Sequence, residues 1–171
     1  MIDYVKLCLE LGAHKAARIE TGQLVFSESF RGLCERNACG RYGRNYTCPP
    51  HIGEISALIG EIRRRGTAIV WQTVHRLEDS YDFEGMQRGR ALHADITQKI
   101  AARADGLVLG AGGCFICETC GVNENVPCRF PSKALSSLEA YGIDVSGIEK
   151  VTDMKYINGV NTVTYFSGLF L

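Results

Sequence analysis

The stretch Thr67-Ala68-Ile69-Val70-Trp71-Gln72-Thr73-Val74 decides the fold class, because it is a continuous apolar and β-branched run. Such a run is typical of a strand buried on both faces of a sheet. Short runs of the same kind predict further strands at residues 16–20, 24–26, 107–109 and 162–171. The first two of these are separated by a turn at Thr21-Gly22.

Segments with helical periodicity alternate with these strands. Ile55, Leu58, Ile59 and Ile62 occupy one face of a predicted helix that ends near Gly66. A longer helix is expected over residues 82–104, with Leu92, Ile96 and Ile100 along its buried face. Three more helices are predicted over residues 2–12, 131–142 and 143–154, the second of them with Leu135, Leu138 and Tyr141 on one face.

This alternation predicts an α/β or α+β fold, with one small mixed sheet flanked by helices. The chain has 171 residues, a typical length for one domain, and its 46% apolar content is sufficient for a hydrophobic core. No internal repeat or linker interrupts it. We therefore expect a single domain, residues 1–171, that carries two cysteine-rich metal-binding loops.

Charge and hydropathy exclude several classes of protein. Nineteen Lys and Arg balance nineteen Asp and Glu, so binding to nucleic acid through bulk positive charge is disfavoured. No apolar run approaches the ~20 residues that span a bilayer, so no membrane association is expected. The start, from Met1 to Lys6, lacks the pattern of a signal peptide. These features predict a cytoplasmic protein.

The cysteines carry the functional signal. Seven of the eight fall into two tight groups, and the eighth is Cys8. In a reducing compartment, clustered cysteines more often bind metal or perform redox chemistry than form disulfides. Metal ligation is therefore the leading hypothesis for both groups.

The second group is the more specific of the two. Cys114, Cys117 and Cys120 follow one another at steps of three, and Cys128 lies eight residues further on, with Pro131 close behind. This spacing is similar to that of bacterial ferredoxins, in which cysteines hold a [4Fe-4S] cluster. The alternative is zinc, because Cys117-Glu-Thr-Cys120-Gly121 by itself resembles a zinc knuckle. Against zinc, the two possible Cys-x2-Cys pairs overlap at Cys117.

The first group offers three thiolates, from Cys34, Cys39 and Cys48. Three cysteines can hold a four-iron cluster and leave one iron open to a substrate or an external ligand. If His51 were a fourth ligand, the same residues would form a Cys3His zinc site. The pair Pro49-Pro50 restricts the backbone before His51, so exposure is the favoured interpretation of His51, and the residues alone leave the fourth ligand open among His51, Cys8 and an external group. Cys8 lies beside an apolar helix stripe, where a buried cysteine is the usual interpretation.

Three arginines, Arg36, Arg41 and Arg44, are interleaved with the first group. Their guanidinium groups could stabilise an anionic cluster or bind an anionic substrate. The alternative is a solvated basic loop. If the strands before the two groups were parallel, both loops would emerge at one edge of the sheet, close enough for electron exchange.

Three segments together resemble a known family. They are Asn37-Ala38-Cys39-Gly40-Arg41-Tyr42-Gly43 with Cys34 and Cys48-Pro49-Pro50, then Gly113-Cys114 through Cys128-Arg129, and finally Ser137-Leu138-Glu139-Ala140-Tyr141-Gly142-Ile143-Asp144-Val145. The resemblance is to the prokaryotic cysteine-rich predicted metal-binding proteins, domain of unknown function 2284. It implies metal binding by the seven clustered cysteines and supplies no reaction. Members are frequent in anaerobes, which suits an oxygen-sensitive cluster.

The sequence thus predicts a cytoplasmic protein with two [4Fe-4S] clusters. It would serve electron transfer, or small-molecule redox or sulfur chemistry at the three-cysteine cluster. The expected partners are a redox protein or a small anionic molecule, and homo-oligomers are also compatible with the near-neutral pI of 6.9. The alternative is a zinc protein in which both groups are structural and the sheet serves as an interaction module. Whether the chain is an enzyme stays open.

Overall fold

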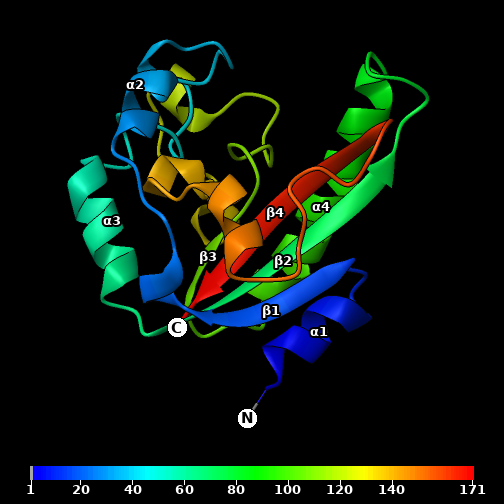
Figure 1. The fold of residues 1–171 in the computed structure, drawn as a ribbon. Coiled ribbons are helices and arrows are strands. Elements are labelled where there is room, and N and C mark those ends of the chain that lie inside the picture. Colours follow the sequence, from blue (N-terminus) through cyan, green and yellow to red (C-terminus); the bar gives the residue numbers. More distant parts are fainter. Residues whose placement is uncertain (1) are drawn as a thin grey trace.

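The structure is a computed structural model that describes residues 2–171 (Figure 1). Its helices and strands follow the chain in the order α1 (Tyr4–Glu10), β1 (Lys15–Glu20), α2 (Ser29–Glu35), α3 (Ile55–Arg63), β2 (Thr67–Arg76), α4 (Phe83–Ala101), β3 (Leu107–Leu109) and β4 (Thr162–Phe170). Short 3-10 helices occupy Thr21–Gln23 (η1), Gly121–Glu124 (η2), Pro131–Lys133 (η3), Glu139–Tyr141 (η4) and Val145–Lys150 (η5). The predicted combination of helices with one small sheet is confirmed.

The sheet has four strands in the order β1-β2-β4-β3, and every neighbouring pair is antiparallel. The expected mixed sheet is therefore wrong. The reason lies in the position of β4: β2 and β3 are joined by α4 and run in the same direction, but β4 is inserted between them. Because the C-terminal strand separates the two, no parallel pair forms, and the fold is α+β.

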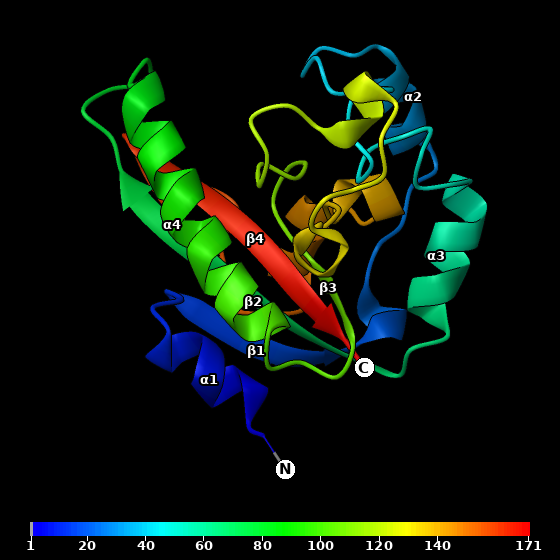
Figure 2. The ribbon, with the colours of Figure 1, turned by 180° about the vertical axis from the view of Figure 1, so that it is seen from behind.

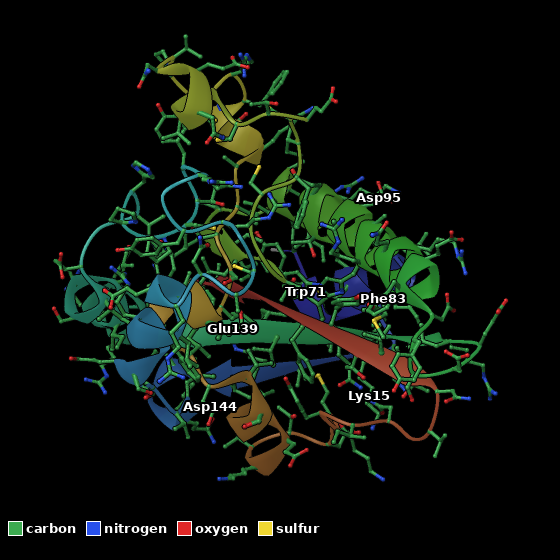
Figure 3. The ribbon with its side chains drawn as sticks, turned by 90° about the horizontal axis from the view of Figure 1, so that it is seen from above. Lys15, Trp71, Phe83, Asp95, Glu139 and Asp144 are labelled. Carbon is green, nitrogen blue, oxygen red and sulfur yellow. The ribbon has the colours of Figure 1, made fainter. Side chains whose placement is uncertain are left out.

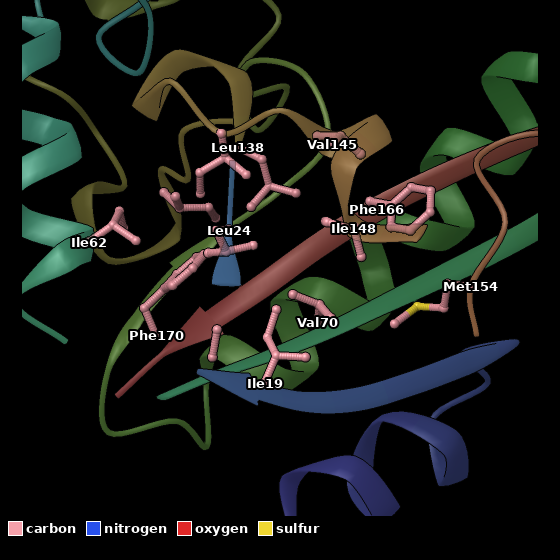
Figure 4. Packing of buried hydrophobic residues seen from close by; sticks show 13 residues of the cluster. Ile19, Leu24, Ile62, Val70, Leu138, Val145, Ile148, Met154, Phe166 and Phe170 are labelled. Carbon is pink, nitrogen blue, oxygen red and sulfur yellow. The ribbon is translucent and has the colours of Figure 1, made fainter. Parts of the chain in front are cut away.

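Strand alternation divides the core into two clusters, one on each face of the sheet. On β2, Ala68 and Val70 face one cluster, while Ile69 and Trp71 face the other. The second cluster is covered by α1 and α4, which lie on the same face of the sheet in Figure 2. The first cluster is covered by the loops and 3-10 helices after residue 130 and by α3, through Leu138, Ile148 and Ile62 (Figure 4).

The buried face of α4 differs from the predicted one. Leu92 is 59% exposed, whereas Ile96 and Ile100 are buried as expected. The stripe instead continues through His93, which is buried because both of its ring nitrogens form hydrogen bonds to side chains on the sheet. These hydrogen bonds turn the side of α4 that carries His93 toward the sheet, and Leu92 is left exposed.

The helices predicted over 131–142 and 143–154 are replaced by η3, η4 and η5. Between η3 and η4 the chain runs extended, because Gly110 donates to the Ser136 carbonyl at 2.8 Å and Leu138 donates to the Gly110 carbonyl at 3.2 Å. Similarly, residues 24–26 form only a single bridge, Phe26 with Ile143, and no strand. Backbone pairing with distant segments overrides the local periodicity here.

None of the helices within residues 2–171 combines the length and the apolar character needed to cross a membrane.

Candidate metal centre

The two cysteine-rich segments lie side by side beyond the sheet, on the side away from α1 (Figures 1 and 2). Cys34 lies in the last turn of α2, and the chain then loops through Cys39 and Cys48 before α3. The second segment leaves β3 through Gly110–Gly113 and carries Cys114. The two segments are 60 to 80 residues apart in the chain and are joined by a set of hydrogen bonds, with sequence separations such as 69 and 79.

Asn45 and Thr47 form the joint between the segments. The Asn45 side chain donates to the Cys114 carbonyl at 2.9 Å, and the Cys114 amide donates to the Thr47 hydroxyl at 3.0 Å. The side-chain oxygen Oδ1 of Asn45 in turn accepts hydrogen bonds from the backbone amide and the hydroxyl of Thr47. Both side chains are buried, so each of these polar groups depends on its protein partner.

A direct contact brings the two cysteine groups together. A Cβ atom placed on Gly113 would lie 3.0 Å from Cys48 Sγ, tighter than ordinary van der Waals contact. The absence of a side chain at Gly113 therefore allows the Cys48 thiol to pack against the backbone next to Cys114. A cysteine of the first group thus adjoins the first cysteine of the second.

The thiols of the first group lie close enough to influence one another. Burial raises the pKa of Cys34, and the neighbouring Cys39 raises it further. Burial also raises the pKa of Cys48; a hydrogen bond with Thr47 opposes this, and Cys39 and Cys34 add to it. Because burial and neighbouring thiols disfavour the thiolate forms of Cys34 and Cys48, these two side chains are suited to bind a cation that neutralises them.

The second group shows the same relationship among four thiols. Burial raises the pKa of Cys114, and Cys117, Cys128 and Cys120 each raise it further, against a hydrogen bond from the Ile116 amide. These four cysteines line a cavity of about 360 Å³ together with Cys39 of the first group. That volume falls within the range of small-ligand pockets, roughly 300–1,000 Å³.

Within residues 2–171, no three Cys, His, Asp or Glu side chains converge closely enough to hold a single metal ion. Four thiolates around one zinc ion would lie roughly 3.8 Å apart, given a Zn–S bond of about 2.3 Å and tetrahedral angles. In a four-iron cluster each thiolate binds a different iron atom, so the sulfurs are spread more widely. Sets of three and four thiols are donors that both a zinc ion and an iron–sulfur cluster accept.

Cationic side chains surround the second group. The Arg41 and Arg90 guanidinium groups each lie over the ring of Phe115, at 3.8 and 3.4 Å from its centroid. Burial lowers the pKa of Arg90, and the charge of Arg41 lowers it further. Arg129 pairs with Glu124 and donates to the Thr119 carbonyl at 3.2 Å, within the second cysteine segment. These positive charges favour thiolates and bound anions nearby.

The family model described as "Predicted metal-binding protein (DUF2284)" matches residues 17–171. This chain belongs to that family. No curated protein and no solved structure matches it.

Cys8 differs from the other cysteines in its place in the chain and in its surroundings. It lies outside the part of the chain that matches DUF2284, and it is fully buried among Trp71, Ile96 and Ile100 on the far face of the sheet. Burial raises the pKa of its thiol to about 12. It is therefore a core residue, as its place beside an apolar stripe predicts, and it does not reach the other thiols.

His51 is exposed beside the first group, where its Nε2 lies 3.2 Å from the Gly43 carbonyl and its ring meets Tyr46 edge-on. That contact engages one ring nitrogen within its own loop. The predicted ligand set of this DUF2284 protein, Cys34, Cys39, Cys48, Cys114, Cys117, Cys120 and Cys128, excludes it and stays a prediction.

Sequence reasoning missed the joint residues Asn45 and Thr47. Nothing in the local sequence marks either of them, because their partners lie in the second segment.

Proposed function

We propose that this protein is a two-cluster iron–sulfur protein that transfers electrons. Cys114, Cys117, Cys120 and Cys128 would hold one [4Fe-4S] cluster, and Cys34, Cys39 and Cys48 would hold the other. Such clusters supply one-electron transfer when bound. The observation that carries the proposal is the pair of thiol groups, of four and of three, that meet where Cys48 Sγ packs against Gly113.

The donor spacing supports iron–sulfur over zinc. Both metals accept thiolates, so residue type alone does not separate them. Cys114, Cys117 and Cys120 follow one another at steps of three, with Cys128 further on, as in bacterial ferredoxins. Zinc sites usually take two separate Cys-x2-Cys pairs, whereas here the two possible pairs overlap at Cys117.

The surroundings of the second group support an electron-transfer role. Phe115, Ile116 and Phe130 flank its cysteines and are 39–46% exposed. Apolar side chains next to a cluster exclude water and help to set its potential. Because these side chains are also accessible from outside, they would form the contact with a redox partner protein, the partner class we propose.

Anaerobic purification followed by metal analysis and a visible spectrum tests the proposal. The expected result is about eight irons per chain, four for each cluster, with broad brown visible absorbance that bleaches on reduction. About two zinc ions per chain and no colour would instead establish the structural zinc protein.

A further inference from the structure

A second cavity lies between α4 and the segment that leads from β3 to Cys114. Its volume is about 430 Å³, which falls within the range of small-ligand pockets, roughly 300–1,000 Å³. Figure 3 shows Asp95 on α4, the helix that forms one wall of this cavity. Cys114 and Ile116 line both this α4 cavity and the cavity of the second cysteine group. A ligand in the α4 cavity would therefore lie directly beside the metal centre.

Hydrogen bonds between its walls set the shape of the α4 cavity. The Gln98 side chain, on α4, donates to the Lys133 carbonyl at 2.7 Å. Gly110, at the end of β3, donates to the Ser136 carbonyl at 2.8 Å. These two bonds tie η3 and the residues after it to α4 and to the sheet. The walls of the cavity are therefore held in place by contacts within the protein.

Much of the lining of the α4 cavity is apolar. Ala91 and Ala94 line it from α4, and Leu135 and Phe115 line it from the segments opposite. Apolar walls with a few polar groups are typical of sites that bind small organic molecules. The lining therefore favours a ligand with an apolar body.

Arg90 gives the α4 cavity a positive charge. Its guanidinium group is half-buried and lies over the ring of Phe115, a contact that leaves the N–H groups in the guanidinium plane free to donate. Among residues 2–171, Arg90 forms no ion pair. Lys133 adds a second cation to the lining, and the acidic lining residue, Asp95, is bound to Lys99 at 2.6 Å. The charge of Arg90 therefore calls for an anion.

The backbone of residues 111–113 supplies further donors to the lining. Within residues 2–171, the amides of Ala111, Gly112 and Gly113 donate no hydrogen bond to another protein group. The next amide, of Cys114, donates to the Thr47 hydroxyl at 3.0 Å. Successive free amides in a turn are a common means of binding the oxygens of an anion.

We propose that the α4 cavity binds a small organic anion, with its oxyanion head group on Arg90 and its apolar body between α4 and Leu135. The proposal goes beyond the proposed function, because the site is built from α4, the glycine segment and Leu135 whichever metal the cysteines hold. Carboxylates and phosphates both present oxygens that fit the fork of a guanidinium group. The head group is therefore identified by the choice of probe.

The test is anaerobic calorimetric titration of the full chain, as purified, with four probes. Benzoate carries a carboxylate on an apolar ring, and benzamide is its neutral counterpart. We expect benzamide to bind at least about tenfold more weakly than benzoate, because it loses the charge-assisted hydrogen bonds. Phenyl phosphate tests the other head group, and inorganic phosphate tests a head group without an apolar body. Inorganic phosphate should bind more weakly than either aromatic anion.

Two variants locate the binding site. Arg90→Met is expected to weaken benzoate binding by about tenfold or more, since it removes the charged donor. Arg88→Met is the matched control: Arg88 is on the same helix, its side chain is 64% exposed and it does not line the cavity. Its benzoate titration should match that of the wild type. Ala94→Leu keeps Arg90 and changes an exposed helix position, so it tests the site even if Arg90→Met does not fold. The larger side chain should fill the cavity and weaken benzoate binding.

Each outcome decides one part of the proposal. Equal binding of benzoate and benzamide, or wild-type affinity in both Arg90→Met and Ala94→Leu, would overturn it. Inorganic phosphate bound as tightly as benzoate would overturn the role of the apolar walls. Tighter binding of phenyl phosphate than of benzoate would support the site with a phosphate head group. Metal analysis of the same samples tests the proposed function separately: a zinc protein that binds benzoate at Arg90 would overturn the iron–sulfur assignment and support the anion site.

Discussion

Cys48 Sγ packs against the backbone of Gly113, the residue immediately before Cys114, where a Cβ atom would lie only 3.0 Å away. The contact joins the last cysteine of the first segment to the residue before the first cysteine of the second segment. The same Cβ atom would lie 3.3 Å from Cδ of Arg41, whose guanidinium group is stacked on the ring of Phe115. A single missing methyl group therefore sets how closely the two groups approach.

Gly113→Ala is expected to push Cys48 away from the second segment by a few tenths of an ångström, because Cβ contacts at this distance are not tolerated without movement. Iron loading at the three-cysteine site should fall, and the magnetic interaction between the two reduced clusters should weaken in electron paramagnetic resonance spectra. Gly32→Ala is the control: nothing lies within 4 Å of its added methyl group, and it is in α2 beside Cys34. It should stabilise the helix by about 0.5–1 kcal/mol and leave the spectra unchanged.

Asn45→Ala is expected to lower the free energy of unfolding by about 1–3 kcal/mol, because it leaves the buried Thr47 amide without a partner and the Cys114 carbonyl with only the bond from Arg41 at 3.3 Å. Asn123→Ala removes another hydrogen bond between the segments, to the Arg44 carbonyl at 3.0 Å, but from an exposed side chain. Its cost should stay below about 1 kcal/mol, since water can replace the lost partner. Urea unfolding of the two variants measures the difference, and equal costs would contradict the role of the buried joint.

The sequence predicts the elements of this fold better than their arrangement. The apolar run 67–74 and the periodicity of residues 55–62 lead directly to β2 and α3, because local burial patterns determine both. The place of β4 between β2 and β3 depends on residues almost a hundred positions apart, which no local pattern encodes. Likewise, cysteine spacing divides the ligand candidates into four and three, but Asn45 and Thr47 become relevant only through tertiary contacts with the second segment.

Single cysteine replacements test whether the two cysteine groups hold separate clusters. Cys120→Ser should remove only the iron of the second site, about four of eight, and Cys34→Ser only that of the first, because each group holds its own cluster in our proposal. Complete loss of colour in either variant would indicate one shared site. Cys8→Ala should leave the iron content unchanged and lower stability slightly, since it removes a small buried side chain in the cluster with Trp71. Iron analysis per chain and thermal unfolding distinguish these results.

His93 lies in a continuous chain of hydrogen bonds between α4 and the sheet. The Thr97 hydroxyl donates to the backbone carbonyl of His93. The Thr97 oxygen therefore accepts a hydrogen bond from the Ser167 hydroxyl, at 3.1 Å. His93 Nε2 then donates to Ser167 at 2.7 Å, and its Nδ1 accepts from Thr73 at 2.9 Å. Thr73 in turn accepts from His75 at 2.9 Å. The chain is complete only when the His93 ring is neutral.

Burial, together with the smaller effect of the nearby His75, lowers the pKa of His93 to about 3. In the unfolded chain a histidine has a pKa of about 6.5. As the pH falls below that value, His93 binds a proton in the unfolded chain but stays neutral in the folded protein. The stability contribution of neutral His93 is therefore complete above pH 6.5 and is lost toward pH 3. Between pH 7.5 and pH 5 this one group should lower the free energy of unfolding by about 2 kcal/mol.

The variant His93→Gln should be less stable than the wild type at pH 7.5, because the amide, although it carries a donor and an acceptor, lacks the volume of the ring and does not place these groups where the two ring nitrogens lie. It should lose about 2 kcal/mol less than the wild type when the pH is lowered to 5, since its side chain does not titrate. Urea unfolding at both pH values, in matched anaerobic samples, cancels the effect of acid on the metal sites. His14→Gln, at an exposed position, should keep the wild-type pH dependence. Equal pH dependence in His93→Gln and the wild type would mean that His93 is protonated within the folded core.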